Sequence, residues 1–398
     1  MVPDARAAAE SPLLLIPGPT PVPRRVLEAL ARPTLAHNSP ASGFQLKRLQ
    51  TGLLRSLGFS GESEPELPAV LVTAGSGTSA MESALVNTVA PGEAVVVVSH
   101  GFFGDRFADL ARGHGARVEQ VSCEWGEQVA VELVDRALTE SGAAVLTVTH
   151  VDTANGVVSP LSAYAQVARA HGALLVLDAV ASQGGMPIEM AQEGIDVVVA
   201  ASQKALAMPP GLAIVVASQR ALEHRRRLKA QAGYFLDWLN WLAPMADPTR
   251  DYFATLPTNL IAAGAVAIEV AETEGWPARF ARHRQMASAA RRGLRAMGLY
   301  TVSGDELLGA TVSALAVPPG IPPAALQLEV AKEGVAVAGG LARWRPGSIR
   351  IGHMGATSLP ELLRGVAALE QALVRLGVPV ERGAGVAELL SGWEAGAG

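Results

Sequence analysis

The sequence predicts an α/β protein with a mainly parallel β-sheet, followed by a smaller C-terminal α+β domain. Short apolar runs rich in β-branched residues recur between residues 69 and 218, and most are separated by segments of helical length. Their apolarity is continuous rather than alternating, which is typical of strands covered on both faces. After residue 275 the pattern changes to longer helical stretches with single apolar runs between them.

We expect three segments in the chain: an N-terminal arm over residues 1–20, a large domain over 21–275 and a small domain over 276–398. A length of 398 residues favours two domains over one. Within the arm, residues 1–12 carry no structural pattern and are expected to be loose. The stretch PVPRRVLEAL predicts a helix that begins near Pro23.

The strands predicted for the large domain are apolar runs bounded by glycine, proline or polar residues. They are residues 69–73, 94–99, 143–149, 173–178, 196–202 and 212–218.

In the small domain, the heptad spacing of Phe280, Ala287 and Leu294 predicts a helix. It leads to the apolar segment ATVSALAVP, a helix from about Pro323 and the segment GSIRIGHMG. We expect the last stretch, residues 383–398, to fray because glycine and alanine stand at its ends.

Composition excludes several classes of protein. The formal net charge of −5 argues against a nucleic-acid binder, which needs a basic face. The single Cys123 excludes an internal disulfide and a cysteine metal cluster, so no metal site is expected. No segment approaches the roughly 18 apolar residues that cross a bilayer, and the N-terminus has no apolar signal core. We therefore expect a cytoplasmic protein without a membrane partner.

The stretch VLVTAGSGTSAMESALVN places a glycine turn between a strand and a helix. Gly75 and Gly77 let an anion approach the main chain closely, and Ser76 and Thr78 add hydroxyl donors. A strand, a glycine turn and a helix N-terminus in this order direct unpaired N–H groups at an anion. The turn therefore predicts a phosphate site.

The start of that helix is predicted from a capping-box pattern, Ser79 followed three residues later by Glu82. A dinucleotide site would also need an acidic residue at the end of the next strand to hold a ribose hydroxyl. Ser99 and His100 stand there instead. The phosphate is therefore expected to belong to another ligand.

Two charged residues follow two other predicted strands. Asp178 ends the run ALLVLD, and Lys204 comes just after the run DVVVAAS. Ligands of open α/β sheets bind at the carboxyl ends of the strands, so both side chains are expected near the glycine turn. A carboxylate that holds a pyridine nitrogen protonated, a lysine that forms a Schiff base and a phosphate cradle are the requirements of pyridoxal 5′-phosphate (PLP).

With these residues in place, the chain resembles the class V aminotransferases of the alanine–glyoxylate, serine–glyoxylate and serine–pyruvate group. The resemblance runs from PGPTPVP to RIGHMG and is carried by GSGTSAMESALVN, GFFGDRFADLAR, LLVLDAVASQGGMP, SQKALAMPPGLA, YFATLPTNLI and SIRIGHMG. It implies PLP-dependent fold type I with a seven-stranded, mainly parallel sheet, and a homodimer.

The resemblance also implies roles for single residues. Lys204 would form the Schiff base, Asp178 would pair with the pyridine nitrogen and Phe103 would stack on the cofactor ring. The phosphate ligands would be Ser76, Gly77, Thr78 and Gln203.

Three further positions follow from the family pattern. Tyr252 and Thr255 match residues that reach across a dimer interface to the neighbouring subunit's phosphate. Arg350 matches the arginine that binds the substrate α-carboxylate, a role that suits a planar bidentate side chain. One departure is Ala154, which stands where the family often has a serine, so Thr153 is expected to take over part of that hydrogen bonding.

The expected reaction is a ping-pong transamination between alanine or serine and a 2-oxo acid, glyoxylate or pyruvate, with Lys204 as general base. A cysteine desulfurase is excluded because Cys123 lies too early in the chain. Two further possibilities stay open. One is a different class V enzyme, such as a 2-aminoethylphosphonate–pyruvate transaminase, and the second is a non-catalytic partner subunit with the same fold.

Overall fold

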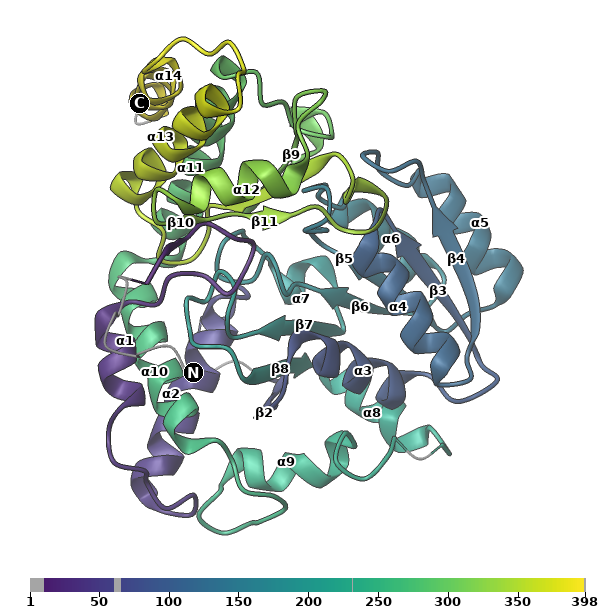
Figure 1. The fold of residues 1–398 in the computed structure, drawn as a ribbon. Coiled ribbons are helices and arrows are strands. Elements are labelled where there is room, and N and C mark those ends of the chain that lie inside the picture. The colour runs from purple at the N-terminus through teal and green to yellow at the C-terminus, as the bar shows by residue number, and fades with distance from the viewer. Residues whose placement is uncertain (1–10, 61–65, 231, 397–398) are drawn as a thin grey trace, which may run out of the picture.

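The computed structural model describes residues 11–60, 66–230 and 232–396. Its centre is a seven-stranded sheet with the strand order β2-β8-β7-β6-β5-β3-β4 (Figure 1). Strand β8 runs antiparallel to β2 and β7, and the other neighbours are parallel. The mainly parallel seven-stranded sheet is confirmed. Its strands are β2 (Ala69–Ala74), β3 (Ala94–Ser99), β4 (Arg117–Ser122), β5 (Val145–Thr149), β6 (Leu174–Asp178), β7 (Val197–Ala201) and β8 (Leu212–Ala217).

Strand β4 was not among the predicted strands. Its sequence, RVEQVS, alternates polar and apolar residues, and only Val121 is buried. The strand lies at the edge of the sheet, pairs with β3 alone and leaves most of its side chains exposed or half-buried, so it lacks the continuous apolarity of the buried strands. A search for continuous apolar runs therefore passes over it.

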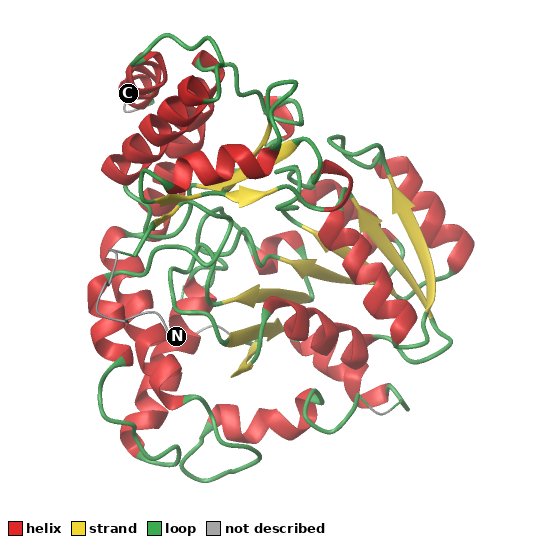
Figure 2. Ribbon diagram, viewed as in Figure 1, coloured by secondary structure: helices red, strands yellow, loops and turns green. Residues whose placement is uncertain are grey.

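Helices cover both faces of this sheet (Figures 1 and 2). None of those in the described ranges has the length and hydropathy needed to cross a membrane. The helices that precede the C-terminal part are α1 (Arg24–Leu30), α2 (Pro40–Arg55), α3 (Gly77–Thr88), α4 (Phe102–Gly113), α5 (Val131–Ser141), α6 (Leu161–Ala170), α7 (Met190–Glu193), α8 (Gln219–Arg227), α9 (Trp238–Ala246) and α10 (Thr258–Glu274).

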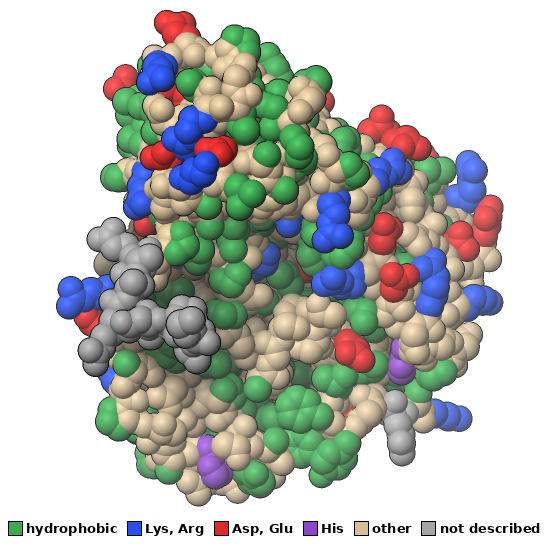
Figure 3. Space-filling model, in the orientation of Figure 1, with side chains coloured by type: hydrophobic (Ala, Val, Ile, Leu, Met, Phe, Trp, Pro, Cys, Tyr) green, Lys and Arg blue, Asp and Glu red, His purple; other side chains and the backbone are tan. Residues whose placement is uncertain are grey.

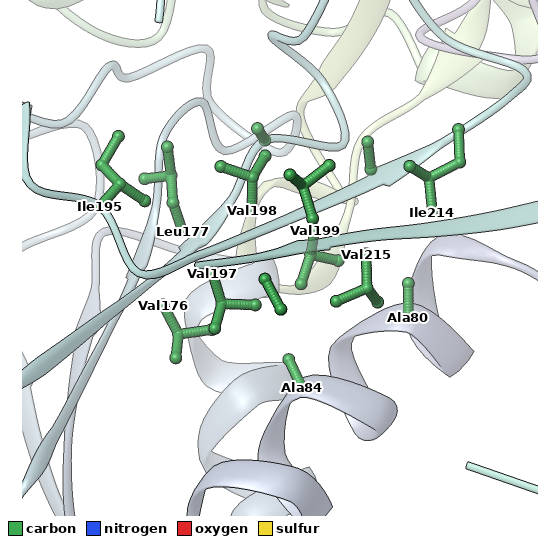
Figure 4. Packing of buried hydrophobic residues seen from close by; sticks show 14 of the residues in the cluster. Ala80, Ala84, Val176, Leu177, Ile195, Val197, Val198, Val199, Ile214 and Val215 are labelled. Atoms are coloured by element: carbon green, nitrogen blue, oxygen red, sulfur yellow. The ribbon is translucent and has the colours of Figure 1, made fainter. Parts of the chain in front are cut away.

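Helix α3 lies close to the strands because small residues face them. Figure 4 shows Ala80 and Ala84 of α3 beside Val197 and Val215. Both alanines are fully buried. At the start of the helix, a Cβ on Gly77 would lie 3.0 Å from Val180 Cγ2, just beyond the end of β6. The packing thus brings the glycine turn to the carboxyl edge of the sheet.

The C-terminal part forms a second layer around a three-stranded antiparallel sheet with the order β11-β12-β9. Its elements are α11 (Trp276–Ala296), β9 (Val312–Ala316), α12 (Pro323–Ala331), β10 (Val335–Ala336), β11 (Ala338–Gly339), β12 (Ser348–Gly352), α13 (Leu359–Arg375) and α14 (Ala384–Ala395). The helices predicted from the spacing of Phe280 and from Pro323 are confirmed as α11 and α12.

The stretch that was expected to fray is helical instead. Ala384–Ala395 form α14, which packs against α11. Glycines make this close approach possible, since a Cβ on Gly293 would lie 2.9 Å from Leu389 Cβ. Leu389 is fully buried in the same contact, and this burial outweighs the weak helix propensity of the glycines.

The N-terminal segment, residues 13–20, begins with residues that pack against the C-terminal part. Strand β1 (Leu13–Leu14) pairs in parallel with β10, and Leu15 is buried in the C-terminal core. The looseness predicted for residues 1–12 falls mostly on residues 1–10, which lie outside the described ranges. Large buried clusters lie on the main sheet and in the C-terminal part, and the domain limits at residues 20 and 275 stay predictions.

The contact between α2 and α10 leads to a stability prediction. A Cβ on Gly52 of α2 would overlap Ile268 Cγ2 of α10. Gly52→Ala should therefore lower the free energy of unfolding by about 1–3 kcal/mol through overpacking, although alanine favours helices. The matched control is Gly113→Ala on α4, where no atom lies within 4 Å of the added Cβ. Chemical denaturation should show loss of stability for the first variant only, and equal stability of the two would contradict the packing described.

Candidate active site

The centre of the candidate site is a lysine turn at the carboxyl edge of the sheet. Lys204 lies three residues after β7, in a turn closed by hydrogen bonds from the Met208 amide to the Ser202 carbonyl (3.1 Å) and from the Ala207 amide to the Lys204 carbonyl (2.9 Å). Asp178 is the last residue of the neighbouring strand β6 and is 4% exposed. The two residues singled out in the sequence therefore lie at the same edge.

Burial shifts the pKa of both groups towards neutrality. It raises the pKa of Asp178 to about 7, and Asp152 adds to the rise while the Val180 amide, Lys204 and Arg106 oppose it. Burial also lowers the pKa of Lys204 to about 8, helped by the positive charge of Arg350 and opposed by Asp178. The carboxyl and the amine can therefore both change protonation state near physiological pH.

The helix that follows the glycine turn begins three residues earlier than predicted. Ser76, not Ser79, is the N-cap of α3, and the two serines form a reciprocal capping box. The Ser79 amide donates to Ser76 Oγ at 3.3 Å, and the Ser76 amide donates to Ser79 Oγ at 2.7 Å. The Ser79–Glu82 prediction was wrong because serine itself can complete the box. Gly77 and Thr78 thus occupy the first helical turn, where amides have no intrahelical acceptor.

The next group of predicted site residues lies around a buried aspartate. Asp152 is fully buried and accepts hydrogen bonds from the Phe103 amide (2.7 Å) and the Ala154 amide (2.9 Å). Arg350 of β12 donates from Nη1 to the Thr153 carbonyl (3.1 Å) and from Nε to the Gly339 carbonyl (2.8 Å). Burial lowers the pKa of Arg350 to about 10, and the negative charge of Asp152 opposes the shift.

The N-terminal segment runs directly over the lysine. Lys204 Nζ donates to the Pro17 carbonyl, Thr20 Oγ1 donates to the Lys204 carbonyl (3.0 Å) and the Thr20 amide donates to the Gln203 carbonyl (3.1 Å). Gly18 has φ +103°, and a Cβ there would lie 2.6 Å from Lys204 Cδ. Sequence reasoning assigned no role to this segment, although PGPTPVP was part of the family resemblance.

Several features of this group of residues suit PLP. The first turn of α3 offers amides and hydroxyls to a phosphate, and a carboxyl and an amine lie at the neighbouring strand ends. Gln203 Oε1 and Thr153 Oγ1 are buried without a hydrogen-bond partner in the described chain. The threonine hydroxyl can donate to a ligand or accept from it, whereas the glutamine oxygen can only accept. The described residues form no group of three or more His, Cys, Asp or Glu side chains that could hold a metal ion.

Two predicted residues lie apart from the other site residues. Tyr252 is 66% exposed, and its hydroxyl lies 3.4 Å from Thr255 Oγ1, which is also exposed. The Tyr252 ring also contacts His37. None of the contacts recorded for these two side chains in the described chain involves the other predicted site residues, so one chain does not bring them together.

Sequence reasoning missed two charged residues at the site, Asp152 and Arg106. Asp152 closely follows the buried strand β5, much as Asp178 ends β6, so its position at a strand end was an available signal. Arg106 lies one helical turn after Phe102 on α4. Its position in the motif GFFGDRFADLAR gave no indication of its contacts.

Comparison with known proteins agrees with this geometry. The profile of the family Aminotransferase class-V matches residues 65–355. The soluble hydrogenase small subunit of Synechococcus sp. is 33% identical over 94% of this chain and 96% of its own length. The L-aspartate–glyoxylate aminotransferase of Paracoccus denitrificans is 34% identical and covers 94% of each chain.

Among solved structures, the alanine–glyoxylate aminotransferase of Nostoc sp. superposes with a TM-score of 0.86 at 31% identity, over 91% of this chain and 95% of its own. The family profile, the extent of the matches and the shared fold lead to one conclusion. The chain belongs to the class V aminotransferases, PLP-dependent enzymes of fold type I that transfer amino groups.

Proposed function

We propose that this aminotransferase moves the amino group of a small amino acid, alanine or serine, to glyoxylate or pyruvate. The observation that carries the proposal is the coupled pair of Asp178 and Lys204 beside the first turn of α3. Two relatives support the acceptor, because the Nostoc and Paracoccus proteins are both named for glyoxylate. Their named donors differ, alanine in one and aspartate in the other.

When bound, PLP supplies an aldehyde that condenses with amines and a ring that withdraws electrons from the substrate α-carbon. In our proposal Asp178 pairs with the ring nitrogen, Phe103 stacks on the ring and Thr153 adds a hydrogen bond. The phosphate ligands are Ser76, Gly77, Thr78 and Gln203.

Lys204 would act as the nucleophile and as the proton carrier. With a pKa of about 8, a fraction of its Nζ is neutral at physiological pH and can accept the proton from the substrate α-carbon. Arg350 would hold the substrate α-carboxylate. Its hydrogen bonds to the Gly339 and Thr153 carbonyls use two of the five guanidinium N–H groups and fix the plane of the others.

The two halves of the reaction would use the same side chains in opposite directions. The donor leaves as a 2-oxo acid before the acceptor enters. In the first half Lys204 would take the proton from the α-carbon of the donor and pass it on, and in the second half it would deliver a proton to the α-carbon of the new amino acid. This order gives ping-pong kinetics.

We also propose a homodimer in which Tyr252 and Thr255 reach the neighbouring active site. Their exposure supports this proposal. Tyr234, Phe235 and Leu239 are exposed as well, and Figure 3 shows hydrophobic side chains gathered around α9. Exposed aromatic side chains of this kind are typical of interfaces. The cytoplasmic location stays a prediction.

A second candidate function comes from the Synechococcus relative, which is named as a hydrogenase subunit rather than as an aminotransferase. In that case this chain would be a non-catalytic partner with an intact cofactor crevice. The pKa values of Lys204 and Asp178 near neutrality favour catalysis, since a purely structural role needs neither.

A donor–acceptor matrix tests the proposal. Alanine, serine, glycine, aspartate and 2-aminoethylphosphonate are each offered with glyoxylate and with pyruvate, and the 2-oxo acid products are measured. We expect the highest kcat/KM for alanine or serine with glyoxylate or pyruvate, and no turnover by Lys204→Ala. Preference for the phosphonate would favour the other class V activity, and no turnover with any pair would favour the non-catalytic partner.

Asp178 gives a prediction for pH dependence. Its pKa in the folded apoprotein is about 7, against 3.8 for an aspartate free in water, so the folded state binds more protons between these values. The contribution of Asp178 to stability is therefore present at low pH and is lost as pH rises through about 7. Asp178→Asn should raise the melting temperature of the apoprotein at pH 8, with a smaller gain at pH 5, and should reduce transamination by more than about 100-fold.

The control for that experiment is Asp109→Asn, because Asp109 lies exposed on α4 and pairs with Arg112. This variant should melt like the wild type at both pH values. A stability gain for Asp178→Asn that does not depend on pH would contradict the assigned pKa.

A hybrid dimer tests the contribution from the neighbouring subunit. One chain carries Lys204→Ala and the other carries Tyr252→Ala with Thr255→Ala, so each homodimer lacks a group in both sites. In the hybrid, one site has all three wild-type groups if Tyr252 and Thr255 come from the partner. Activity should then recover to about half that of the wild-type dimer. A hybrid as inactive as both parents would contradict the shared site.

A further inference from the structure

Arg106 on α4 contacts two separate parts of the proposed cofactor site. Its Nη1 donates to Thr78 Oγ1 at 3.0 Å, in the first turn of α3. Its guanidinium carbon lies 5.0 Å from the centroid of the Phe103 ring and 4.8 Å from that of Phe102. The two rings meet edge to face at 5.2 Å. One side chain therefore touches both the phosphate cradle and the aromatic residue proposed to stack on the cofactor.

The hydrogen bond to Thr78 has a fixed direction. A guanidinium has only donors, so Thr78 Oγ1 must be the acceptor. Within the described chain this is the one hydrogen bond recorded for the Thr78 side chain, so its hydroxyl proton stays available as a donor. Thr78 is the second residue of α3, where the helix amides also point outward. Arg106 thus prepares the hydroxyl to donate to an anion at this helix end.

The carboxylates of Glu82, Asp105 and Asp109 line the same cavity as Arg106, but none of them forms a salt bridge with it. Among the described residues no salt bridge to Arg106 is found, and the adjacent Asp105 instead accepts hydrogen bonds from Ser99 and Gln120. Arg106 is also one of the two cations that act on Asp178, the other being Lys204. A partly buried cation without a salt-bridge partner favours the binding of an anion nearby.

We propose that Arg106 is a positioning residue for the cofactor, which orients the Thr78 hydroxyl towards the phosphate and holds the Phe103 ring against the cofactor plane. This inference rests on the proposed roles of Thr78 and Phe103. The contacts between Arg106 and the two rings are of the cation–π type, in which the attraction between the guanidinium charge and the ring restrains the orientation of the aromatic side chain.

The test compares two ligands that differ only in the phosphate, PLP and pyridoxal. Their dissociation constants are measured by absorbance titration of the apoprotein, for the wild type and for Arg106→Gln. We expect the variant to bind PLP about ten- to a hundred-fold more weakly, the range for a charge-assisted hydrogen bond, and to change the pyridoxal constant much less. Arg106→Lys, which keeps the charge, should recover part of the preference for PLP.

Arg112→Gln is the matched control. Arg112 lies on the same helix, is exposed and pairs with Asp109 and Gln120 away from Thr78. This variant should bind both ligands like the wild type. An equal loss of PLP and pyridoxal binding in Arg106→Gln would indicate a purely structural role and overturn the proposal.

Thr78→Val provides a second, independent variant, which removes only the hydroxyl. It should reduce the preference for PLP over pyridoxal. Adding Arg106→Gln to this variant should weaken PLP binding by a smaller factor than adding it to the wild type, because the two groups act through one hydrogen bond. An unchanged preference in Thr78→Val would overturn the proposal even if Arg106→Gln failed to fold. If the wild type itself bound both ligands equally, the phosphate assignment of α3 would fail, and this inference with it.

Discussion

The buried carboxylate at the end of β6 is the constraint on which the rest of the site depends. Asp178 has its charge removed from water, which is costly unless cations or a cationic ligand compensate it. Asp152 adds a second buried carboxylate nearby. Three cations, Lys204, Arg106 and Arg350, interact with one or the other of these two groups. These cations offset the buried negative charge next to the proposed phosphate site.

Three parts of the molecule contact the turn that contains Lys204, and together these contacts fix the position of the lysine. The main sheet presents the turn at the end of β7, and the N-terminal segment covers it through Pro17 and Thr20. On a third side, Arg279 at the start of α11 donates to the Ala205 carbonyl (2.7 Å) and pairs with Glu274 (2.9 Å). Glu274 also pairs with Arg282, whose Nη2 donates to the Gly355 carbonyl at 2.9 Å.

This network joins the last residues of α10, the C-terminal part and the lysine turn. Contacts from the C-terminal part thus reach the backbone next to Lys204. The arrangement places Arg350, on a strand of the C-terminal part, in contact with the Thr153 carbonyl beside the main sheet. The candidate substrate site thus contains residues of both parts of the molecule.

Much of this could be predicted from the sequence where one physical rule dominates. Buried strands show continuous apolar runs, and charged residues at their ends indicate the ligand edge, so β6, β7, Asp178 and Lys204 were found. The edge strand β4 was missed because its polar alternation hides it, and the cap of α3 was misplaced because two serines can form the box. The contacts of Arg106 and the docking of Gly18 on Lys204 depend on packing between distant segments. No local pattern encodes such contacts.

The most direct test of the account is to identify the residue that binds the cofactor covalently. Borohydride reduction of the purified holoenzyme converts a lysine–PLP linkage into a stable secondary amine, which peptide mapping by mass spectrometry can locate. We expect the added mass on the peptide that contains Lys204. Label on Lys47, Lys229 or Lys332 instead, or no label in protein that retains the cofactor, would contradict it.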